Sequence, residues 1–312
     1  MISLGIDTSN YTTSVALFNS ETNEIISKKQ LLPVKKGEKG LRQSDAVFHH
    51  TVQLPILIEQ LFSGNNLSID CIGVSSKPCD REGSYMPCFL TGLSVAKSLG
   101  YVYKKPVYEF SHQLGHIAAV IQSSDNTDFF KKNFIAFHVS GGTTEAVLVK
   151  ADKQNIFNTE VIFSSSDLKA GQAVDRVALM LGINFPGGKE LDVLSRKSKV
   201  DFKIHPSLKE STFSLSGVEN KCLKMLENGE KRENIAKYCI DYISASLEAA
   251  ADLLLNEYGD LPLVFSGGVM SNSLIRERFT EKYNAVFSIP EFSSDNALGV
   301  AVAAFLKESN NG

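Results

Sequence analysis

The sequence contains no tryptophan and only five cysteines among 312 residues. The cysteines are dispersed and form no Cys-x-x-Cys pair, a pattern that argues against a disulfide framework or a zinc ribbon and favours reduced thiols. No apolar run reaches the roughly 18 residues that a transmembrane helix requires. The first apolar stretch is preceded by no basic leader. We therefore expect a cytoplasmic protein.

The sequence also lacks an excess of positive charge, since its formal net charge is −3. The chain as a whole is therefore no electrostatic attractor for nucleic acid, although a local basic patch remains compatible with this value. Hydrophobic residues make up 43% of the chain and charged residues 21%, which is typical of a globular protein. The length is sufficient for two domains.

One segment, 133–150 (NFIAFHVSGGTTEAVLVK), joins two apolar runs through a polar turn that contains two glycines. This pattern predicts a β-hairpin. Glycine lets the backbone approach a ligand closely, and successive turn N–H groups can hold phosphate oxygens. Glycine turns of this kind also occur in many proteins that bind nothing, so the hairpin alone does not identify a site.

A second copy of this pattern lies 131 positions earlier, at 2–18 (ISLGIDTSNYTTSVALF). Internal duplication of this kind constrains the whole fold. Two lobes that each open with strand, polar turn and strand are typical of the actin-like ATPase fold, an α/β architecture with duplicated sheet domains around a cleft. We place the lobes at 1–110 and 111–312, and we expect the terminal helix, 294–308, to pack back toward the first lobe. The polar residues that match between the copies are Ser9, Thr12 and Thr13 with Ser140, Thr143 and Thr144.

The segment 111–116 (SHQLGH) combines a suitable helix N-cap, Ser111, with histidines at positions 112 and 116. Residues four apart lie on one helical face, so the two imidazoles are able to share a metal ion. Pairs of this spacing also arise by chance. No His-Glu-x-x-His motif is present, which excludes the glutamate base of the zinc proteases.

Other polar residues have an ordinary structural interpretation when each is taken alone. Asp175 fits a solvated helix face, and Asp295 fits the first turn of the terminal helix, where a carboxylate complements the helix dipole. The stretch that leads from a buried strand through Gly267-Gly268 to Asn272 and a helix is typical of a corner that faces phosphate or ribose.

Taken together, these motifs resemble the TsaD family of bacterial tRNA threonylcarbamoyladenosine transferases. The resemblance covers nearly the whole chain, and its motifs occur in the family's order. The matching segments are GIDTSNYTTSVAL, SHQLGH, HVSGGTTEAVLV, AGQAVDRVALMLG, FPGGKELD, FSLSGVENK, FSGGVMSNSLIRERF and FSSDNALGVAVAA.

The resemblance implies transfer of a threonylcarbamoyl group from an adenylate to N6 of adenosine 37 in tRNA, with AMP released. It implies one divalent metal ion, iron or zinc, bound by His112, His116 and Asp295. It also implies a heterodimer with a smaller, TsaB-like homologue, and a homodimer is the alternative. The residues implied to hold the adenylate or an ATP-type nucleotide are His138, Val139, Ser140, Gly141, Gly142, Asp175, Gly188, Asp192 and Asn272.

The sequence departs from the family pattern in three places. Tyr11 and Thr12 stand where the family carries an acidic pair, and Thr143 replaces a histidine in the central turn. The loop 76–87 (SKPCDREGSYMP) replaces a Gly-Pro-Gly-Leu loop. These changes favour a divergent paralogue whose acceptor the sequence does not identify, and adenosine in tRNA is the default acceptor. The alternatives are carbamoyl transfer to a small molecule and a non-catalytic nucleotide-binding scaffold.

Overall fold

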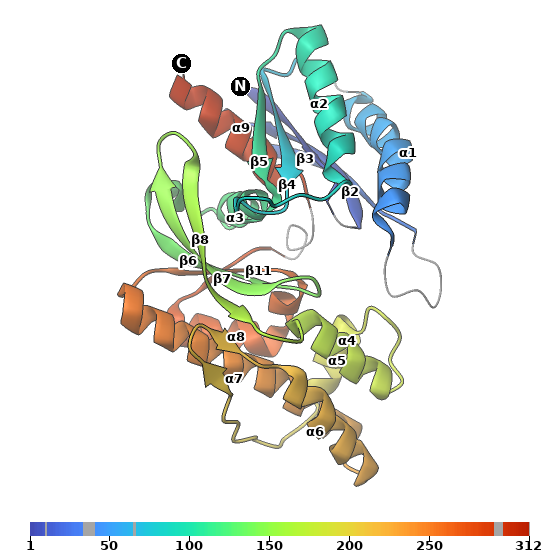
Figure 1. The fold of residues 1–312 in the computed structure, drawn as a ribbon, viewed down its shortest axis with the longest axis vertical. Coiled ribbons are helices and arrows are strands. Elements are labelled where there is room, and N and C mark those ends of the chain that lie inside the picture. Colours follow the sequence, from blue (N-terminus) through green and yellow to red (C-terminus); the bar gives the residue numbers. More distant parts are fainter. Residues whose placement is uncertain (10, 34–40, 65–66, 290–295, 312) are drawn as a thin grey trace. The chain divides into compact units, whose positions relative to one another are not determined.

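The computed structural model describes residues 1–9, 11–33, 41–64, 67–289 and 296–311 (Figure 1). The chain divides into two compact units. The first consists of Met1–Lys132, the hairpin tip Ala151–Thr159 and Ser294–Gly312, and the second of Asn133–Lys150 and Glu160–Ser293. The first unit therefore continues past residue 110 and includes the C-terminal helix. None of the helices in the described ranges is both long and apolar enough to cross a membrane.

The first unit contains a five-stranded sheet with the strand order β3-β2-β1-β4-β5. β1 pairs antiparallel with β2 and parallel with β4, so the carboxyl ends of β1, β4 and β5 share one edge. Ligand sites of open α/β sheets form at this kind of edge. The strands are β1 (Ile2–Asp7), β2 (Thr12–Asn19), β3 (Glu24–Leu31), β4 (Cys71–Lys77) and β5 (Val107–Ser111).

The two faces of this sheet pack against different helices. The apolar side chains of Leu4 and Ile6 on β1 pack with leucines of α1, such as Leu54. Successive residues of a strand point to opposite faces, so Gly5 faces the other side. The helices of this unit are α1 (Gln43–Phe62), α2 (Phe89–Tyr103), α3 (His112–Ser123), the 3₁₀ helix η1 (Thr127–Lys131) and α9 (Leu298–Asn311).

Two glycines bring α9 against the sheet backbone. A Cβ atom on Gly5 would lie 2.2 Å from the carbonyl oxygen of Ala297, and one on Gly73 would lie 1.9 Å from that of Val300. Any larger residue at these positions would push the helix away from the sheet. Gly299 on α9 makes an equally close approach to the backbone of Gly115 on α3. The glycines therefore fix α3 and α9 on the same face of the sheet.

The sheet of the second unit repeats the strand order of the first. Its order is β12-β11-β6-β7-β8-β10-β9, in which β8-β7-β6-β11-β12 corresponds to β3-β2-β1-β4-β5. β6 pairs antiparallel with β7 and parallel with β11, as β1 does with β2 and β4. This confirms the internal duplication predicted from the two hairpins. The strands are β6 (Phe134–Val139), β7 (Thr144–Asp152), β8 (Ile156–Ser165), β9 (Leu208–Lys209), β10 (Thr212–Phe213), β11 (Leu263–Ser266) and β12 (Val286–Phe287).

The helices of the second unit pack with β6 and β11 around an apolar core. The longest of them, α7, contributes Ile235, Ile243 and Leu254 to this core. Phe265 on β11 stacks on Phe137 of β6 at a ring distance of 4.8 Å. The helices are α4 (Ala170–Met180), α5 (Gly188–Ser195), α6 (Ser216–Glu227), α7 (Arg232–Tyr258), the 3₁₀ helix η2 (Gly268–Ser271) and α8 (Ser273–Tyr283).

Candidate functional site

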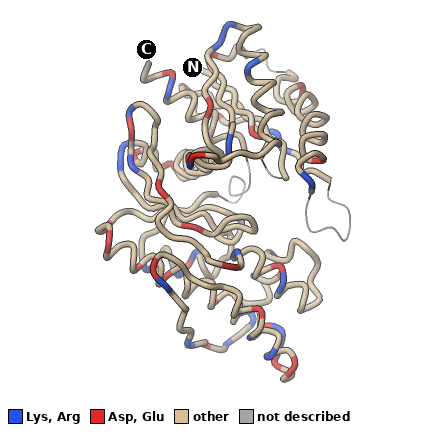
Figure 2. Tube along the Cα trace, viewed as in Figure 1, with Lys and Arg blue, Asp and Glu red and all other residues tan. Residues whose placement is uncertain are grey.

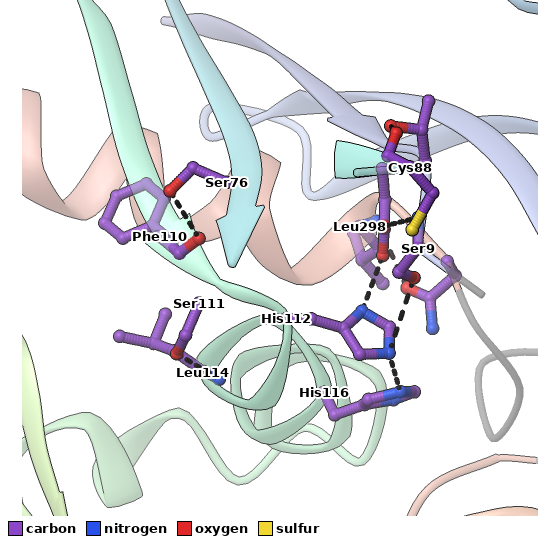
Figure 3. Close-up of polar contacts among 12 residues, drawn as sticks. Ser9, Ser76, Cys88, Phe110, Ser111, His112, Leu114, His116 and Leu298 are labelled. Atoms are coloured by element: carbon purple, nitrogen blue, oxygen red, sulfur yellow. Dashed lines mark hydrogen bonds and ion pairs between the residues drawn. The ribbon is translucent and has the colours of Figure 1, made fainter. Parts of the chain in front are cut away.

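Two histidines of the first unit, His112 and His116, face each other at the start of α3 (Figure 3). The hydroxyl of Ser111 accepts a hydrogen bond from the backbone N–H of Leu114 at 3.2 Å, which confirms Ser111 as the N-cap. With the helix started there, His112 and His116 lie one turn apart, and their Nε2 atoms are separated by 2.9 Å. The predicted arrangement on one helical face is therefore present.

Asp7, at the end of β1, is hydrogen-bonded to the ring nitrogen of His112 that does not face His116. Its Oδ2 lies 2.9 Å from Nδ1 of His112, and its Oδ1 accepts the backbone N–H of Ser9 at 2.8 Å. The aspartate is only 1% exposed. A carboxylate oxygen accepts but does not donate, so Nδ1 of His112 carries the shared proton. A neutral ring of this tautomer presents the lone pair of Nε2 toward His116.

The donor set of this histidine pair fits a transition metal. Two imidazole nitrogens about 2.1 Å from one tetrahedral metal ion are separated by roughly 3.4 Å, about half an ångström more than the observed Nε2–Nε2 separation. An imidazole backed by a carboxylate is the usual support of a metal-binding histidine. Asp295, the third predicted ligand, lies outside the described residues. Within those residues, no group of three His, Cys, Asp or Glu side chains could hold a metal ion.

The loop 76–87 is attached to the same helix start. Asp80 accepts a hydrogen bond from the hydroxyl of Ser111 at 2.9 Å and forms an ion pair with Lys77 at 3.1 Å. The carbonyl oxygen of Pro78 accepts the backbone N–H of Gln113 at 3.0 Å. The loop that departs from the family pattern therefore contacts the N-terminus of the helix that carries both histidines.

In the second unit, the turn between β6 and β7 is closed by its own serine. The hydroxyl oxygen of Ser140 accepts the backbone N–H groups of Gly142 at 3.3 Å and of Thr143 at 3.0 Å. The N–H of Ser140 donates to the carbonyl oxygen of Thr143 at 2.7 Å. The backbone N–H groups of Gly142 and Thr143 therefore have an acceptor within the turn itself. Gly141 and Gly142 remain exposed at the tip.

Two further glycines hold this turn in place: Gly171, which the sequence analysis left unassigned, and Gly267, which it placed in a corner that faces phosphate or ribose. A Cβ atom on Gly171, in the first turn of α4, would lie 2.5 Å from the backbone nitrogen of Gly141. Gly267 has φ +95°, and its Cβ would lie 2.3 Å from the carbonyl oxygen of Val139. The start of α4 and the end of β11 therefore both contact the turn through their backbones. A glycine next to a strand end or in the first turn of a helix is the signal that points to such close approaches.

The strand ends beside the turn are joined by polar contacts. Nδ1 of His138 on β6 lies 3.0 Å from the hydroxyl of Ser266 on β11. Val139 is fully buried, so neither its side chain nor its backbone is exposed to a ligand. The predicted residues from His138 to Gly142 are thus brought together at the carboxyl ends of two parallel strands.

The carboxylates of Asp175 and Asp192 hold different loops, because they accept hydrogen bonds from different helix starts. Asp175 accepts the backbone N–H of Gly187 at 3.0 Å and so holds the turn that leads into Gly188. Asp192 accepts the hydroxyl of Ser273 at 2.7 Å and its backbone N–H at 3.2 Å.

Asn272 is the N-cap of α8, and its side chain accepts the backbone N–H groups of Leu274 and Ile275. Asp192 and Asn272 therefore each accept hydrogen bonds from the first turn of α8, while Asp175 contacts the residue that precedes Gly188. Ser273, which donates to Asp192, was missed by sequence reasoning because serine is common at helix starts.

We predict that Asp175→Asn raises the stability of the protein at neutral pH. Partial burial raises the pKa of the Asp175 carboxyl above its ordinary value, so the ionised form costs stability in the folded state. An asparagine retains the acceptor for Gly187 and carries no charge. The measurement is the urea unfolding free energy of the variant and of wild type at pH 7.

The pH dependence of this gain follows from the direction of the shift. For an acid whose folded pKa is raised, the wild type loses stability as pH rises from the unfolded value, about 3.9, through the folded value. The advantage of Asp175→Asn should therefore shrink toward zero as the pH is lowered to about 4. The exposed Asp128→Asn is the control. An advantage that stays constant with pH would contradict the assignment.

Comparison with solved structures places the chain among proteins of the actin-like ATPase fold. Full-length HypF in the phosphate- and nucleotide-bound form superimposes with a TM-score of 0.62 at 14% identity, over 99% of this chain and 55% of that one. The activator of 2-hydroxyisocaproyl-CoA dehydratase from Clostridium difficile gives 0.55 at 17% identity, over 100% and 97%. A ROK family protein from Streptococcus pneumoniae gives 0.54 at 12% identity, over the full length of both chains. At these identities the likeness shows the fold alone.

Sequence comparison identifies the family. The family model described as TsaD, tRNA N6-adenosine threonylcarbamoyltransferase, matches residues 23–302. The protein of that name from Thermosipho africanus is 33% identical, over 98% of this chain and 94% of its own length. The one from Fervidobacterium nodosum is 31% identical, over 97% and 92%. The chain therefore belongs to the TsaD family of tRNA N6-adenosine threonylcarbamoyltransferases.

Proposed function

We propose that this protein transfers a threonylcarbamoyl group from threonylcarbamoyl-adenylate to N6 of adenosine 37 in tRNA. The observation that carries the proposal is the facing pair His112 and His116, backed by buried Asp7, in a chain of this family. In the reaction, a bond forms between the adenosine nitrogen and the carbamoyl carbon. The bond from that carbon to the phosphate oxygen breaks, AMP leaves, and the amine loses one proton.

The first unit would supply the metal site. His112 and His116 provide two imidazole nitrogens, and Asp295 is the proposed third ligand. When bound, an iron or zinc ion would orient and polarise the carbamoyl oxygen. Asp7 keeps Nε2 of His112 unprotonated and fixes the direction of its ring. Ser111 and Asp80 fix the start of the helix from which both histidines project.

The second unit would hold the adenylate. The exposed backbone of Gly141 and Gly142 allows close approach of a phosphate, and Ser140 keeps the turn in one conformation. Asp175 and Asp192 are carboxylate acceptors suited to hydroxyl groups of the ribose or the threonyl moiety. Gly188 and Asn272 stand at the starts of α5 and α8, where partial positive charge favours an anionic ligand.

The transferase activity is tested with purified components. We expect AMP release and modified tRNA when threonylcarbamoyl-adenylate, tRNA and the TsaB-like partner are supplied together. His116→Ala should lower the rate by about 100-fold or more, the order of loss when one stabiliser of developing charge is removed. Gln122→Ala, on the same helix, is the matched control and should retain the rate.

Other outcomes would select the alternatives. Absence of tRNA modification with the full partner set would reject the proposal. Turnover of carbamoyl-adenylate with a small acceptor and no RNA would indicate a small-molecule carbamoyltransferase. A metal-free His112→Ala protein that still supports the cellular phenotype would indicate a scaffold.

We predict that Asp7→Asn weakens metal binding by about 10- to 100-fold, the usual cost of removing a partner of a metal-binding histidine. An asparagine amide can donate to Nδ1 of His112 and so favour the tautomer with the proton on Nε2, which cannot bind metal. The measurement is competition for Zn²⁺ against a chromophoric chelator. Asp128→Asn removes an exposed carboxylate of the same unit and should leave the affinity unchanged. Equal affinities for all three proteins would separate Asp7 from the metal site.

An apolar stripe on α1 supports the proposed partner. Phe48, Val52 and Ile56 lie four residues apart on one helical face, and 45–63% of each is exposed. Exposed apolar side chains in a row are typical of a helix that packs on another chain. We assign this stripe to the smaller, TsaB-like homologue.

The partner assignment is tested by sedimentation of mixtures with that homologue. Phe48→Asp with Ile56→Asp should abolish the heterodimer, while Thr51→Asp on the same helix should not. If the double substitution instead dissociates a dimer of this chain alone, the stripe belongs to a homodimer. If neither assembly responds to the double substitution, the stripe is no interface.

A further inference from the structure

Residues 197–209, which we call the lysine segment, connect α5 to β9 and carry a concentration of exposed positive charge. Lys197, Lys199, Lys203 and Lys209 are all exposed. The only acids in or directly after the segment are Asp201 and Glu210, so this stretch is positive although the whole chain has a net charge of −3. Figure 2 shows blue stretches along the connection between α5 and α6.

The geometry of the segment turns its polar side chains in one direction. From 201 to 209, exposed residues alternate with half-buried ones, as in an extended strand with one face on the protein. Phe202 packs edge-on against Tyr238 of α7 at a ring distance of 5.3 Å. Leu208 packs against the core of the unit. Lys203, His205, Ser207 and Lys209 therefore share the outer face, about 7 Å apart from one to the next.

The four lysines are not engaged in ion pairs within the described residues, whereas acidic side chains of the neighbouring helices are. Within the described part of the chain, no ion pair or side-chain hydrogen bond engages any of the four ammonium groups. Three acids on the surrounding helices are ion-paired instead, in Arg176–Glu219, Arg196–Glu277 and Lys237–Asp241. The positive charge of the segment is therefore available to an external anion.

A surface hollow of about 420 Å³ lies at the C-terminal end of the segment, and its lining residues are Ser166, Ser207, Lys209, Glu210, Thr212, Phe213 and Ser214. Lys209 is at its wall, with the hydroxyl-bearing Ser207 and Thr212. Asp167 holds this wall by accepting the hydroxyl of Ser214 at 2.6 Å and the backbone N–H of Leu215 at 2.9 Å. Hydroxyl and ammonium groups together are the donors that contact sugar and phosphate in nucleic-acid interfaces.

We propose that the lysine segment binds the phosphodiester backbone of the RNA acceptor and that the hollow beside Lys209 receives a sugar-phosphate unit. This inference rests on the proposed function, because it takes RNA as the acceptor. Cations repeated along an extended strip fit a chain of regularly repeated anions better than a single compact ligand. The contacts are to the backbone, so they position the RNA without reading its bases.

The test measures binding of labelled, unmodified tRNA by fluorescence anisotropy over a series of KCl concentrations. Lys199→Gln, Lys203→Gln and Lys209→Gln combined should weaken binding at least about tenfold at low salt. The slope of log K against log salt should fall by roughly 2 to 3, since each lost phosphate contact removes a little less than one unit. The control is Lys28→Gln, Lys104→Gln and Lys153→Gln combined, which removes three exposed lysines of the first unit.

The outcomes separate this inference from the proposed function. If wild type binds tRNA and the lysine-segment variant binds it equally well, the inference is wrong and the transferase proposal stands. If wild type binds threonylcarbamoyl-adenylate but no tRNA, the proposal of an RNA acceptor and this inference are both wrong. If polyglutamate binds as tightly as tRNA with the same loss in the variant, the segment recognises acidic polypeptide and not RNA. Unchanged thermal unfolding of both variants confirms that they fold.

Discussion

The hydrogen bond between buried Asp7 and Nδ1 of His112 is the contact on which the histidine pair depends. It joins the end of β1 to the first turn of α3 and decides which nitrogen of the ring carries the proton. The glycines that seat α9 and α3 on the sheet bring these elements close enough for the bond to form. Without it, Asp7 would no longer set the tautomer of His112, and the ring would be oriented by its remaining contacts, among them those of Nε2 with His116 and Ser9. A metal-binding histidine pair needs a fixed tautomer and a fixed ring orientation before the metal ion binds.

The duplicated topology has been adapted to different chemistry in its two copies. With the offset of 131 residues between the hairpins, Asp7 in the first unit corresponds to His138 in the second. Both stand near the carboxyl end of the central strand, but Asp7 supports a histidine from a following helix and His138 contacts Ser266 on the neighbouring strand. The same backbone position therefore supports a histidine pair in one unit and a glycine-rich corner in the other.

The departures from the family pattern lie beside the histidine pair of the first unit and within the central turn of the second unit. Asp80 of the altered loop contacts the N-cap of the histidine helix, and Thr143 donates its backbone N–H to Ser140 within the central turn. Tyr11 is partly exposed and Thr12 is buried in β2. The loop and the turn thus remain well connected in spite of their altered residues, through backbone groups and a charged pair. The backbone contacts depend little on side-chain identity, which explains how the family fold tolerates these changes.

The sequence by itself determined the two hairpins, the cap at Ser111 and the spacing of the histidines, because each depends on neighbours within a few residues. It missed β3, an exposed edge strand without apolar alternation, and it did not pair Asp7 with His112. It also left out the hydrogen bonds that the backbone N–H groups of Gly142 and Thr143 donate to Ser140. Only the tertiary structure decided these points, since contacts across 105 residues arise from how sheet and helices pack and leave no periodic signal.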